Sequence, residues 1–169
     1  MSCRLWCRER VQRMGPKEQQ KLWMDLDELG SLSATAQQLK GPITSLPRLL
    51  ESNNKIYLYY NTSEEAVGFI KFGMKKMFLF HPNKGQTQLD VMCVLDFFCR
   101  EAERRRGIGL ELMRAMLSDL KLAPESLAYD RPSPLLFRFL QRHFNLTVFE
   151  TQYSFAIFNG FWIQCTGGS

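Results

Sequence analysis

The sequence predicts an α+β fold, an α/β three-layer arrangement with a central, mostly antiparallel mixed sheet flanked by helices. Three or four strand-like segments with short polar loops follow one another between Lys55 and Phe98, which is typical of an antiparallel meander. A helix precedes this meander, and a loop, helix, strand, helix and strand follow it. The 169 residues suit one domain with a substantial core.

The segment from Pro16 to Leu39 is predicted to be helical. Its apolar positions near one face are Leu22, Leu26 and Leu29. Gly30 is expected to divide this helix into two segments. Thr44 or Ser45 then offers an N-cap for a short helix through Leu50.

Strands are predicted from their β-branched, aromatic and alternating composition. They cover residues 55–60, 67–80, 89–98, 127–129 and 151–158, and residues 161–163 are expected to pair back as a final strand. The segment 89–98 is apolar on both faces apart from Asp96, as expected of a central strand. Asp96 is therefore expected to receive a local hydrogen bond rather than to act as a base.

Two further helices are predicted after the meander. The first covers residues 107–121, and its expected core stripe is Leu110, Met113, Leu117 and Leu120. The second begins with Ser133 as N-cap and Pro134 as the first helical residue. Its apolar face is expected to hold Leu136, Phe139, Leu140 and His143.

Composition narrows the partners and cofactors. The net charge is +5, which favours an acidic partner, but the basic residues are scattered and form no zinc-finger or RNP pattern. We therefore expect no nucleic-acid partner, although a basic nucleic-acid binder remains a competing hypothesis. No apolar run approaches the ~20 residues that a membrane helix needs, so no membrane span is expected. Five cysteines without a Cys-x-x-Cys pair indicate reduced thiols, and two isolated histidines predict no metal site.

Domain organisation is predicted to be simple. Residues 1–15 form a poorly defined basic N-terminus, residues 16–165 a single domain and residues 166–169 a short tail. An arginine-rich start could also be a mitochondrial presequence, but we favour a frayed basic terminus. The chain shows no internal repeat or linker, and a monomer is expected.

The stretch Arg104–Gly109 lies between the apolar strand-like run at 89–98 and the helix-like run from Leu110 to Leu120. Glycines let a ligand approach the backbone, and a helix N-terminus exposes unpaired N–H groups and the positive end of the helix dipole. The basic and glycine-rich turn therefore indicates a phosphate-binding site. The competing interpretation is a solvated basic loop. The pattern Arg-x-x-Gly-x-Gly resembles the acetyl-CoA pyrophosphate loop of the GCN5-related N-acetyltransferases.

Several segments together resemble the α-tubulin N-acetyltransferase family from about residue 20 to Phe161. They are Asp27-Glu28-Leu29-Gly30, Ala36-Gln37-Gln38-Leu39, Pro42-Ile43-Thr44-Ser45, Gly68-Phe69-Ile70-Lys71, Lys75-Lys76, Cys93-Val94-Leu95-Asp96-Phe97 and Asp130-Arg131-Pro132-Ser133. The resemblance implies the acetyltransferase fold, acetyl-CoA as donor and a lysine of α-tubulin in microtubules as acceptor. It also implies a cytoplasmic location on microtubules, including those of a cilium or axoneme.

The resemblance assigns roles by position. Cys93 and Asp130 match the catalytic cysteine and aspartate, and Gln37 matches a glutamine near the active site. The positions that line the tubulin-facing groove are matched by Arg48, Phe78 and Arg131. The stretches that hold acetyl-CoA are matched by Phe97, Phe98, Cys99, Arg100, Arg104, Arg105, Arg106, Gly107, Ile108, Gly109 and Leu110, and by Ser133, Pro134, Leu136, Phe137, Arg138, Leu140 and Arg142.

The chemistry needs a neutral lysine amine, although free lysine titrates near ~10.4. Asp130 is expected to take up the proton, directly or through water. Cys93 is a second candidate that needs a nearby positive charge to lower its pKa, and it would otherwise be a core residue. Backbone N–H groups near Cys93 to Phe98 would stabilise the oxyanion. Lys71, Lys75 and Lys76 with Phe78 are expected to form a basic and aromatic acceptor surface.

The chain also departs from the family pattern. Ile108 and Leu110 stand where polar or basic residues are usual, so the loop offers fewer side-chain donors, and Arg104–Arg106 could compensate. The first strand of the family is not recognisable in residues 1–15, and no long polar tail follows the domain, as in a shortened or divergent copy or an imperfect gene model. Two alternatives to tubulin acetylation are therefore a non-catalytic acetyl-CoA- or microtubule-binding protein, and an acetyltransferase for another protein such as a histone.

Overall fold

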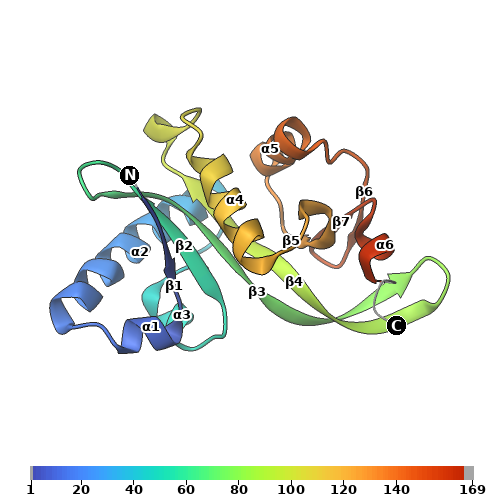
Figure 1. The fold of residues 1–169 in the computed structure, drawn as a ribbon, viewed down its shortest axis with the longest axis horizontal. Coiled ribbons are helices and arrows are strands. Elements are labelled where there is room, and N and C mark those ends of the chain that lie inside the picture. Colours follow the sequence, from blue (N-terminus) through green and yellow to red (C-terminus); the bar gives the residue numbers. More distant parts are fainter. Residues whose placement is uncertain (1, 166–169) are drawn as a thin grey trace. The chain divides into compact units, whose positions relative to one another are not determined.

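The computed structural model describes residues 2–165, which divide into two compact units. Of these residues, the first unit holds those up to Phe72 and Asp96–Asp119, and the second holds Gly73–Leu95 and those from Leu120 onward. Across residues 2–165, seven strands are hydrogen-bonded in the order β1-β2-β3-β4-β5-β7-β6 (Figure 1). The strands are β1 (Ser2–Trp6), β2 (Lys55–Tyr60), β3 (Ala66–His81), β4 (Gly85–Cys99), β5 (Ala128–Asp130), β6 (Phe149–Gln152) and β7 (Phe155–Phe158).

The helices are α1 (Arg8–Gln12), α2 (Pro16–Ala36), α3 (Leu46–Leu50), α4 (Ile108–Leu120), α5 (Pro134–Phe144) and α6 (Phe161–Cys165), with 3-10 turns η1 (Glu101–Glu103) and η2 (Pro124–Ser126). The β1–β2, β2–β3, β5–β7 and β6–β7 pairs are antiparallel, whereas β4 and β5 are parallel. The predicted α+β fold with a mostly antiparallel mixed sheet and flanking helices is confirmed. In the part described, no helix is long and apolar enough to cross a bilayer.

The N-terminal segment contains a strand that the sequence analysis did not recognise. Strand β1 pairs antiparallel with β2, from Ser2 opposite Tyr60 to Trp6 opposite Ile56. The Trp6 side chain is buried, and the Arg10 guanidinium lies 4.5 Å from the centroid of its ring. The expectation of no strand in residues 1–15 was wrong, because this short edge strand is specified by a partner far along the chain. The domain limits themselves remain a prediction.

The first unit has helices on both faces of its part of the sheet. In β2, Ile56 and Leu58 belong to one buried cluster with the apolar stripe of α2. Tyr59 alternates with them and points to the opposite face. There its hydroxyl hydrogen-bonds to Glu111 of α4, and burial raises the pKa of that phenol. The alternation along one strand therefore separates the α2 layer from the α4 layer.

Helix α2 runs unbroken through Gly30, so the predicted division there was wrong. A glycine inside a helix costs about 1 kcal/mol relative to alanine and does not by itself end the helix. Gly30 has a packing role instead, because a Cβ added there would lie 2.0 Å from the carbonyl oxygen of Thr44. The missing side chain lets the segment before α3 lie directly against α2.

The apolar stripe of α4 also differs from the prediction. The buried positions are Ile108, Leu112, Met113 and Met116. Of the four predicted positions only Met113 is buried, and the three leucines are half-buried. Both sets have helical spacing, so the periodicity of this apolar helix did not distinguish them.

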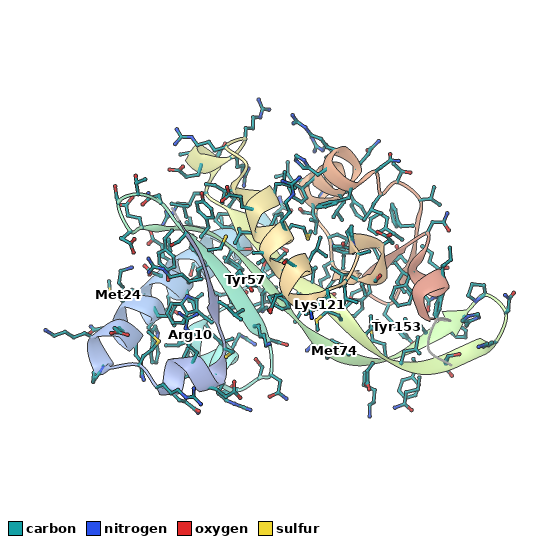
Figure 2. The ribbon with its side chains drawn as sticks, viewed as in Figure 1. Arg10, Met24, Tyr57, Met74, Lys121 and Tyr153 are labelled. Carbon is teal, nitrogen blue, oxygen red and sulfur yellow. The ribbon has the colours of Figure 1, made fainter. Side chains whose placement is uncertain are left out.

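In the second unit, two predictions for the C-terminal region were wrong. The segment predicted as one strand, residues 151–158, forms parts of β6 and β7 around a turn in which Tyr153 has φ 56°. Tyr153, which is labelled in Figure 2, is 66% exposed. Residues 161–163 begin helix α6 instead of a strand, and Phe161 is buried in a cluster with Met77 and Ile157. Ser133 caps α5 as predicted, since its side chain accepts the N–H of Leu136. Of the two candidates for the cap of α3, Thr44 and Ser45, it is Ser45 that accepts the N–H of Arg48.

The close approach at Gly30 gives a stability test. Gly30→Ala is expected to lower the free energy of unfolding by about 1–3 kcal/mol, because the new methyl group displaces the Thr44 backbone. A decrease in the free energy of unfolding would indicate the packing conflict, because the higher helix propensity of alanine would by itself stabilise α2. Urea denaturation followed by circular dichroism measures the change.

Gly41→Ala is the matched control, because no atom lies within 4 Å of a Cβ there. This variant is expected to change stability by less than about 1 kcal/mol. Equal effects of the two substitutions would contradict the packing role of Gly30.

Candidate active site

The predicted phosphate loop lies in the first unit, between η1 and the start of α4. Arg105 and Gly107 have positive φ angles of 66° and 81°, so the chain turns sharply before the helix begins at Ile108. Nothing lies within 4 Å of a Cβ at Gly107, which leaves the backbone open to a ligand. The first N–H groups of α4 have no partner within the helix. This geometry fits a bound phosphate.

The three loop arginines are exposed. The Nε of Arg104 donates to the carbonyl of Cys99 at 3.2 Å, and Arg106 pairs with Glu103 at 3.2 Å. Such surface pairs hold a side chain only weakly, so both arginines can turn to an anionic ligand. Arg100 is more constrained, since it pairs with Glu28 at 3.0 Å and its Nε donates to the carbonyl of Ala66.

Other predicted cofactor residues of this stretch point inward. The Phe98 side chain packs in the core against Phe69, and the Ile108 side chain is 5% exposed. They can reach a ligand only through their backbone. Burial raises the pKa of the Cys99 thiol to about 11. Because the Ile108 side chain is buried, this apolar residue does not take the place of an exposed hydrogen-bond donor in the loop.

A buried carboxylate in the first unit gathers most of the polar groups nearby. Asp96 is 5% exposed, and its Oδ1 accepts from Ser33 Oγ at 2.8 Å, Gln37 Nε2 at 3.0 Å and the N–H of Phe97 at 3.0 Å. Its Oδ2 accepts from Thr44 Oγ1. The expectation that Asp96 receives a local hydrogen bond is confirmed, and its partners place Gln37 at the end of α2.

Ser33 and Thr44 were not predicted as site residues. Both are buried polar side chains, at 1% and 0% exposure. Ser33 lies one turn after Leu29, on the same face as Leu22, Leu26 and Leu29. A polar residue on this otherwise apolar face was the sequence feature that could have identified it. Thr44 was considered only as a cap, a role that Ser45 takes.

Cys93 and Asp130 lie together in the second unit. Strands β4 and β5 run parallel with Cys93 opposite Ala128, so Asp130 lies two residues further along β5 on the same face. Asp130 Oδ1 accepts from Ser154 Oγ at 2.7 Å, and Ser154 O accepts from the N–H of Arg131 at 2.8 Å. The turn between β6 and β7 thus holds the carboxylate. Ser154 is a further residue that the sequence analysis missed.

The two candidate proton acceptors have different environments. The Cys93 side chain is fully buried, and its Sγ lies 3.4 Å from the carbonyl of Val91 and 3.9 Å from Met77 Sδ. Burial, together with the negative charge of Asp130, raises the pKa of the Cys93 thiol to about 12, although Lys75 acts in the opposite direction. Cys93 is therefore a neutral thiol near pH 7 and a poor proton acceptor.

Helix α5 carries the second predicted cofactor stretch. Leu136 and Leu140 are buried, and the Phe137 ring stacks on Phe149 at 4.6 Å between centroids. Arg138 and Arg142 are exposed. The arginines are thus the α5 side chains of this set that are available to an anion.

The predicted acceptor positions belong to both units. Arg48 is exposed on α3 in the first unit, while Phe78 on β3 and Arg131 after β5 are exposed in the second. The expected role of Lys71 at an exposed acceptor surface was wrong, because Lys71 is 8% exposed and its Nζ donates to the carbonyl of Ile43. Among residues 2–165, no group of three His, Cys, Asp or Glu side chains is placed to hold a metal ion.

Solved structures identify the class of fold. The xEco2 acetyltransferase domain bound to a K105-CoA conjugate aligns with a TM-score of 0.58 at 14% identity, covering 83% of this chain and 85% of that one. A ribosomal-protein-alanine N-acetyltransferase from Brucella melitensis aligns with a TM-score of 0.53 at 15% identity, covering 90% and 97% of the two chains. The fold is thus that of an acetyltransferase.

Sequence comparison identifies the family. Residues 4–167 match the family model described as GNAT acetyltransferase, Mec-17, and the chain belongs to this family. It is 37% identical over 171 residues to an α-tubulin N-acetyltransferase of Phytophthora infestans, covering 90% of this chain and 96% of that protein. It is 38% identical over 142 residues to α-tubulin N-acetyltransferase 1 of Danio rerio, covering 80% of this chain and 48% of that protein. The chain thus spans about half the length of the latter relative.

The pKa of Cys93 gives a chemical test. Native Cys93 is expected to resist iodoacetamide at pH 9, because its folded pKa is raised to about 12 from an ordinary value of 9.0 and the thiolate is the reactive form. In urea the same thiol is expected to react readily. Peptide mass spectrometry after timed quenching measures both rates, and Cys7, which is not fully buried, serves as the internal reference.

The raised pKa of the Cys93 thiol also makes the stability of the fold depend on pH. A thiol whose pKa is higher in the folded than in the unfolded chain stabilises the native state below pH 9, and this contribution disappears as the pH rises toward 12. Alkylation of native Cys93 as fast as Cys7 would contradict the buried, neutral thiol.

Proposed function

We propose that this protein transfers the acetyl group of acetyl-CoA to a lysine side chain of α-tubulin in microtubules. The observation that supports this most strongly is the similarity to the Phytophthora infestans α-tubulin N-acetyltransferase over 90% of this chain and 96% of that protein. The proposal places the protein in the cytoplasm on microtubules, including those of a cilium or axoneme, as a monomer without a metal cofactor.

The residues present fit acetyl-CoA, which supplies the thioester carbonyl that the amine attacks. The N-terminus of α4 and the arginines Arg104–Arg106 would bind the pyrophosphate, since backbone N–H groups and guanidinium groups both favour phosphate oxygens. The resemblance assigns acetyl-CoA contacts to α5 as well, where Arg138 and Arg142 are the exposed basic side chains. Backbone N–H groups near the end of β4 would stabilise the developing oxyanion.

Asp130 is proposed as the group that accepts the proton from the lysine amine, directly or through one water. It is a partly exposed carboxylate at the end of β5, held in one orientation by Ser154. Cys93 is assigned a lesser role, because its neutral thiol is a poor acceptor. We propose that it shapes the apolar floor beside Asp130.

The acceptor surface is proposed to include the exposed face of β3. Met74, which Figure 2 labels, Phe78 and Phe80 are 53%, 50% and 59% exposed. Lys75 and Lys76, which lie between Met74 and Phe78 in the sequence, are exposed as well. Large exposed apolar side chains beside lysines suit an acidic protein partner. Arg131, exposed after β5 in the same unit, is proposed to contribute a further basic contact. Arg48 of the first unit is proposed as a separate basic contact to tubulin.

The decisive experiment uses purified protein, polymerised microtubules and acetyl-CoA, with mass spectrometry of α-tubulin as the readout. Acetylation of an α-tubulin lysine above the level of an enzyme-free control supports the proposal. A higher rate on histones than on microtubules would instead favour another protein substrate, and microtubule binding without acetylation would favour a non-catalytic binder.

Asp130→Asn tests the proton acceptor. Transfer is expected to fall at least ~100-fold, because the amide cannot take up a proton, while the affinity for acetyl-CoA stays within about twofold. Stopped-time acetylation assays and calorimetry measure the two quantities. Asp90→Asn, an exposed carboxylate on β4, is the control. Full activity of Asp130→Asn would remove Asp130 from the mechanism.

The loop arginines give a separate test of cofactor binding. The triple variant Arg104→Gln, Arg105→Gln, Arg106→Gln is expected to weaken acetyl-CoA binding about tenfold at low salt, equivalent to about 1.4 kcal/mol. The difference from wild type is expected to shrink as salt screens the phosphates. Calorimetry at two ionic strengths measures the dissociation constant of acetyl-CoA. Arg13→Gln, at an exposed arginine, is the control. An unchanged affinity would place the phosphates elsewhere.

A further inference from the structure

We infer that Gln152 is a positioning residue for the protein acceptor, because its side-chain amide holds the outer end of β3 and with it Phe78 and Phe80 of the proposed acceptor surface. This inference rests on the function proposed above and identifies a support for one of its surfaces. Gln152, Phe78, Phe80 and Asp130 all belong to the second unit.

The outer part of β3 has an open edge. In the strand order β3 lies between β2 and β4, but β2 pairs with it only from Ala66 to Phe72, whereas β3 continues to His81. From Gly73 onward, one edge of β3 thus has no strand partner within the described part of the chain. A strand that is paired on one side only is held less firmly there, and its backbone groups on that side need other partners.

The side chain of Gln152 supplies such a partner. The N–H of Phe80 donates to Gln152 Oε1 at 2.8 Å, and the carbonyl of Phe80 accepts from Gln152 Nε2 at 3.1 Å. A primary amide carries an acceptor and a donor side by side, as the backbone of a strand does. The Gln152 amide therefore pairs with Phe80 in place of a neighbouring strand and fastens β6 to the open edge of β3.

The polarity of this contact is fixed by the backbone. Gln152 Nε2 also donates to Glu150 Oε1 at 3.2 Å, so both of its hydrogens are used. Reversing the amide would place Oε1 against two acceptors, the carbonyl of Phe80 and the carboxylate of Glu150. Glu150 also accepts from Trp162 Nε1 at 3.3 Å, and the Trp162 ring lies 4.8 Å from that of His81 between centroids. Phe80 and the residue after it are thus both held.

The end of β6 also holds the proposed proton acceptor. Asp130 and Gln152 each lie opposite Phe155 of β7, so their side chains lie on one face of the sheet, two strand spacings or ~10 Å apart. Ser154, two residues after Gln152, donates to Asp130 Oδ1 at 2.7 Å. One short turn therefore connects the outer end of β3 with the carboxylate that is proposed to accept the proton.

This connection bears on the binding of a large acceptor. Phe78 and Phe80 are exposed aromatic side chains, and such side chains bind a partner best when their backbone is fixed beforehand, because less conformational freedom is then lost. Acetyl-CoA has its proposed contacts on the loop before α4 and on α5. Loss of the Gln152 amide is therefore expected to weaken binding of the protein acceptor and to leave the cofactor unaffected.

Gln152→Met removes the amide but keeps a side chain of similar length. We expect KM for microtubules to rise at least ~5-fold, while kcat and the Kd for acetyl-CoA stay within about twofold. Gln88→Met, at an exposed glutamine on β4, is the matched control and is expected to change none of the three quantities. Steady-state acetylation assays and calorimetry measure them.

A double-mutant cycle tests whether Gln152 acts through the aromatic side chains. The combined variant Phe78→Ala, Phe80→Ala removes the proposed contacts but leaves the backbone of Phe80 bonded to Gln152. In this background Gln152→Met is expected to raise KM by less than about twofold, because the side chains that it positions are absent. A full ~5-fold rise there would show that Gln152 acts elsewhere and would overturn the inference.

Backbone hydrogen exchange, measured by NMR, tests the contact without any acetyl transfer. The Phe80 amide proton is expected to exchange at least about tenfold faster in Gln152→Met than in wild type or Gln88→Met. The amide protons of Ala156 and Ile157, buried in β7, are expected to keep their rates, since the loss is local.

Gln152→Glu is a second variant in case Gln152→Met does not fold. Its carboxylate is repelled by the carbonyl of Phe80 and by Glu150, so the same acceleration of exchange and rise in KM are expected. Gln88→Glu controls for the added negative charge.

The outcomes separate this inference from the proposed function. Acetylation of microtubules by wild type with an unchanged KM or unchanged Phe80 exchange in the Gln152 variants would overturn the inference and leave the proposed function intact. No acetylation of any protein by wild type would contradict the proposed function and the positioning role with it. Equal losses of microtubule and acetyl-CoA binding would indicate a general structural role of Gln152 and would also overturn the inference.

Discussion

The buried carboxylate of Asp96 joins three segments of the first unit: the end of α2, the segment before α3 and strand β4. A charge removed from water needs hydrogen-bond donors, and an unsatisfied one costs several kcal/mol. Its donors come from α2, from Thr44 and from its own strand. Since these segments are far apart in sequence, satisfying one side chain fixes the end of α2, the segment before α3 and β4 together. Lys71 on neighbouring β3 strengthens this junction through the carbonyl of Ile43.

Part of this junction could be predicted from the sequence. Asp96 is a lone charge in an apolar strand, and that contrast correctly predicted a local hydrogen bond. The donors could not be predicted, because pairing depends on which face of α2 meets β4. Thr44 and Ser45 were equivalent candidates for a helix cap, and the structure assigns the cap to Ser45 and the buried donor to Thr44. Neighbouring hydroxyls with similar local propensities are distinguished only by tertiary packing.

The fold shows the same division between local and non-local information. The long strands β3 and β4, the helices α2, α4 and α5 and the Ser133 cap follow from periodicity and capping chemistry, and these were predicted correctly apart from their exact bounds. Strand β1 was missed because its partner is β2, and the buried face of α4 was misplaced because apolar residues occupy both possible stripes. The turn at Tyr153 lacks the glycine or asparagine that usually indicates a left-handed residue.

That unpredicted turn bears directly on the candidate chemistry of the second unit. Ser154, the residue after Tyr153, donates its hydroxyl hydrogen to Asp130 and accepts the N–H of Arg131 through its carbonyl. Arg131 itself has φ 42°, a strained value for a non-glycine residue, so the chain bends sharply just beyond Asp130. The residue type at position 130 could be recognised from sequence, but its orientation depends on a hairpin formed later in the chain. The hydrogen bond from Ser154 thus orients the carboxylate while Asp130 stays partly exposed at the end of β5.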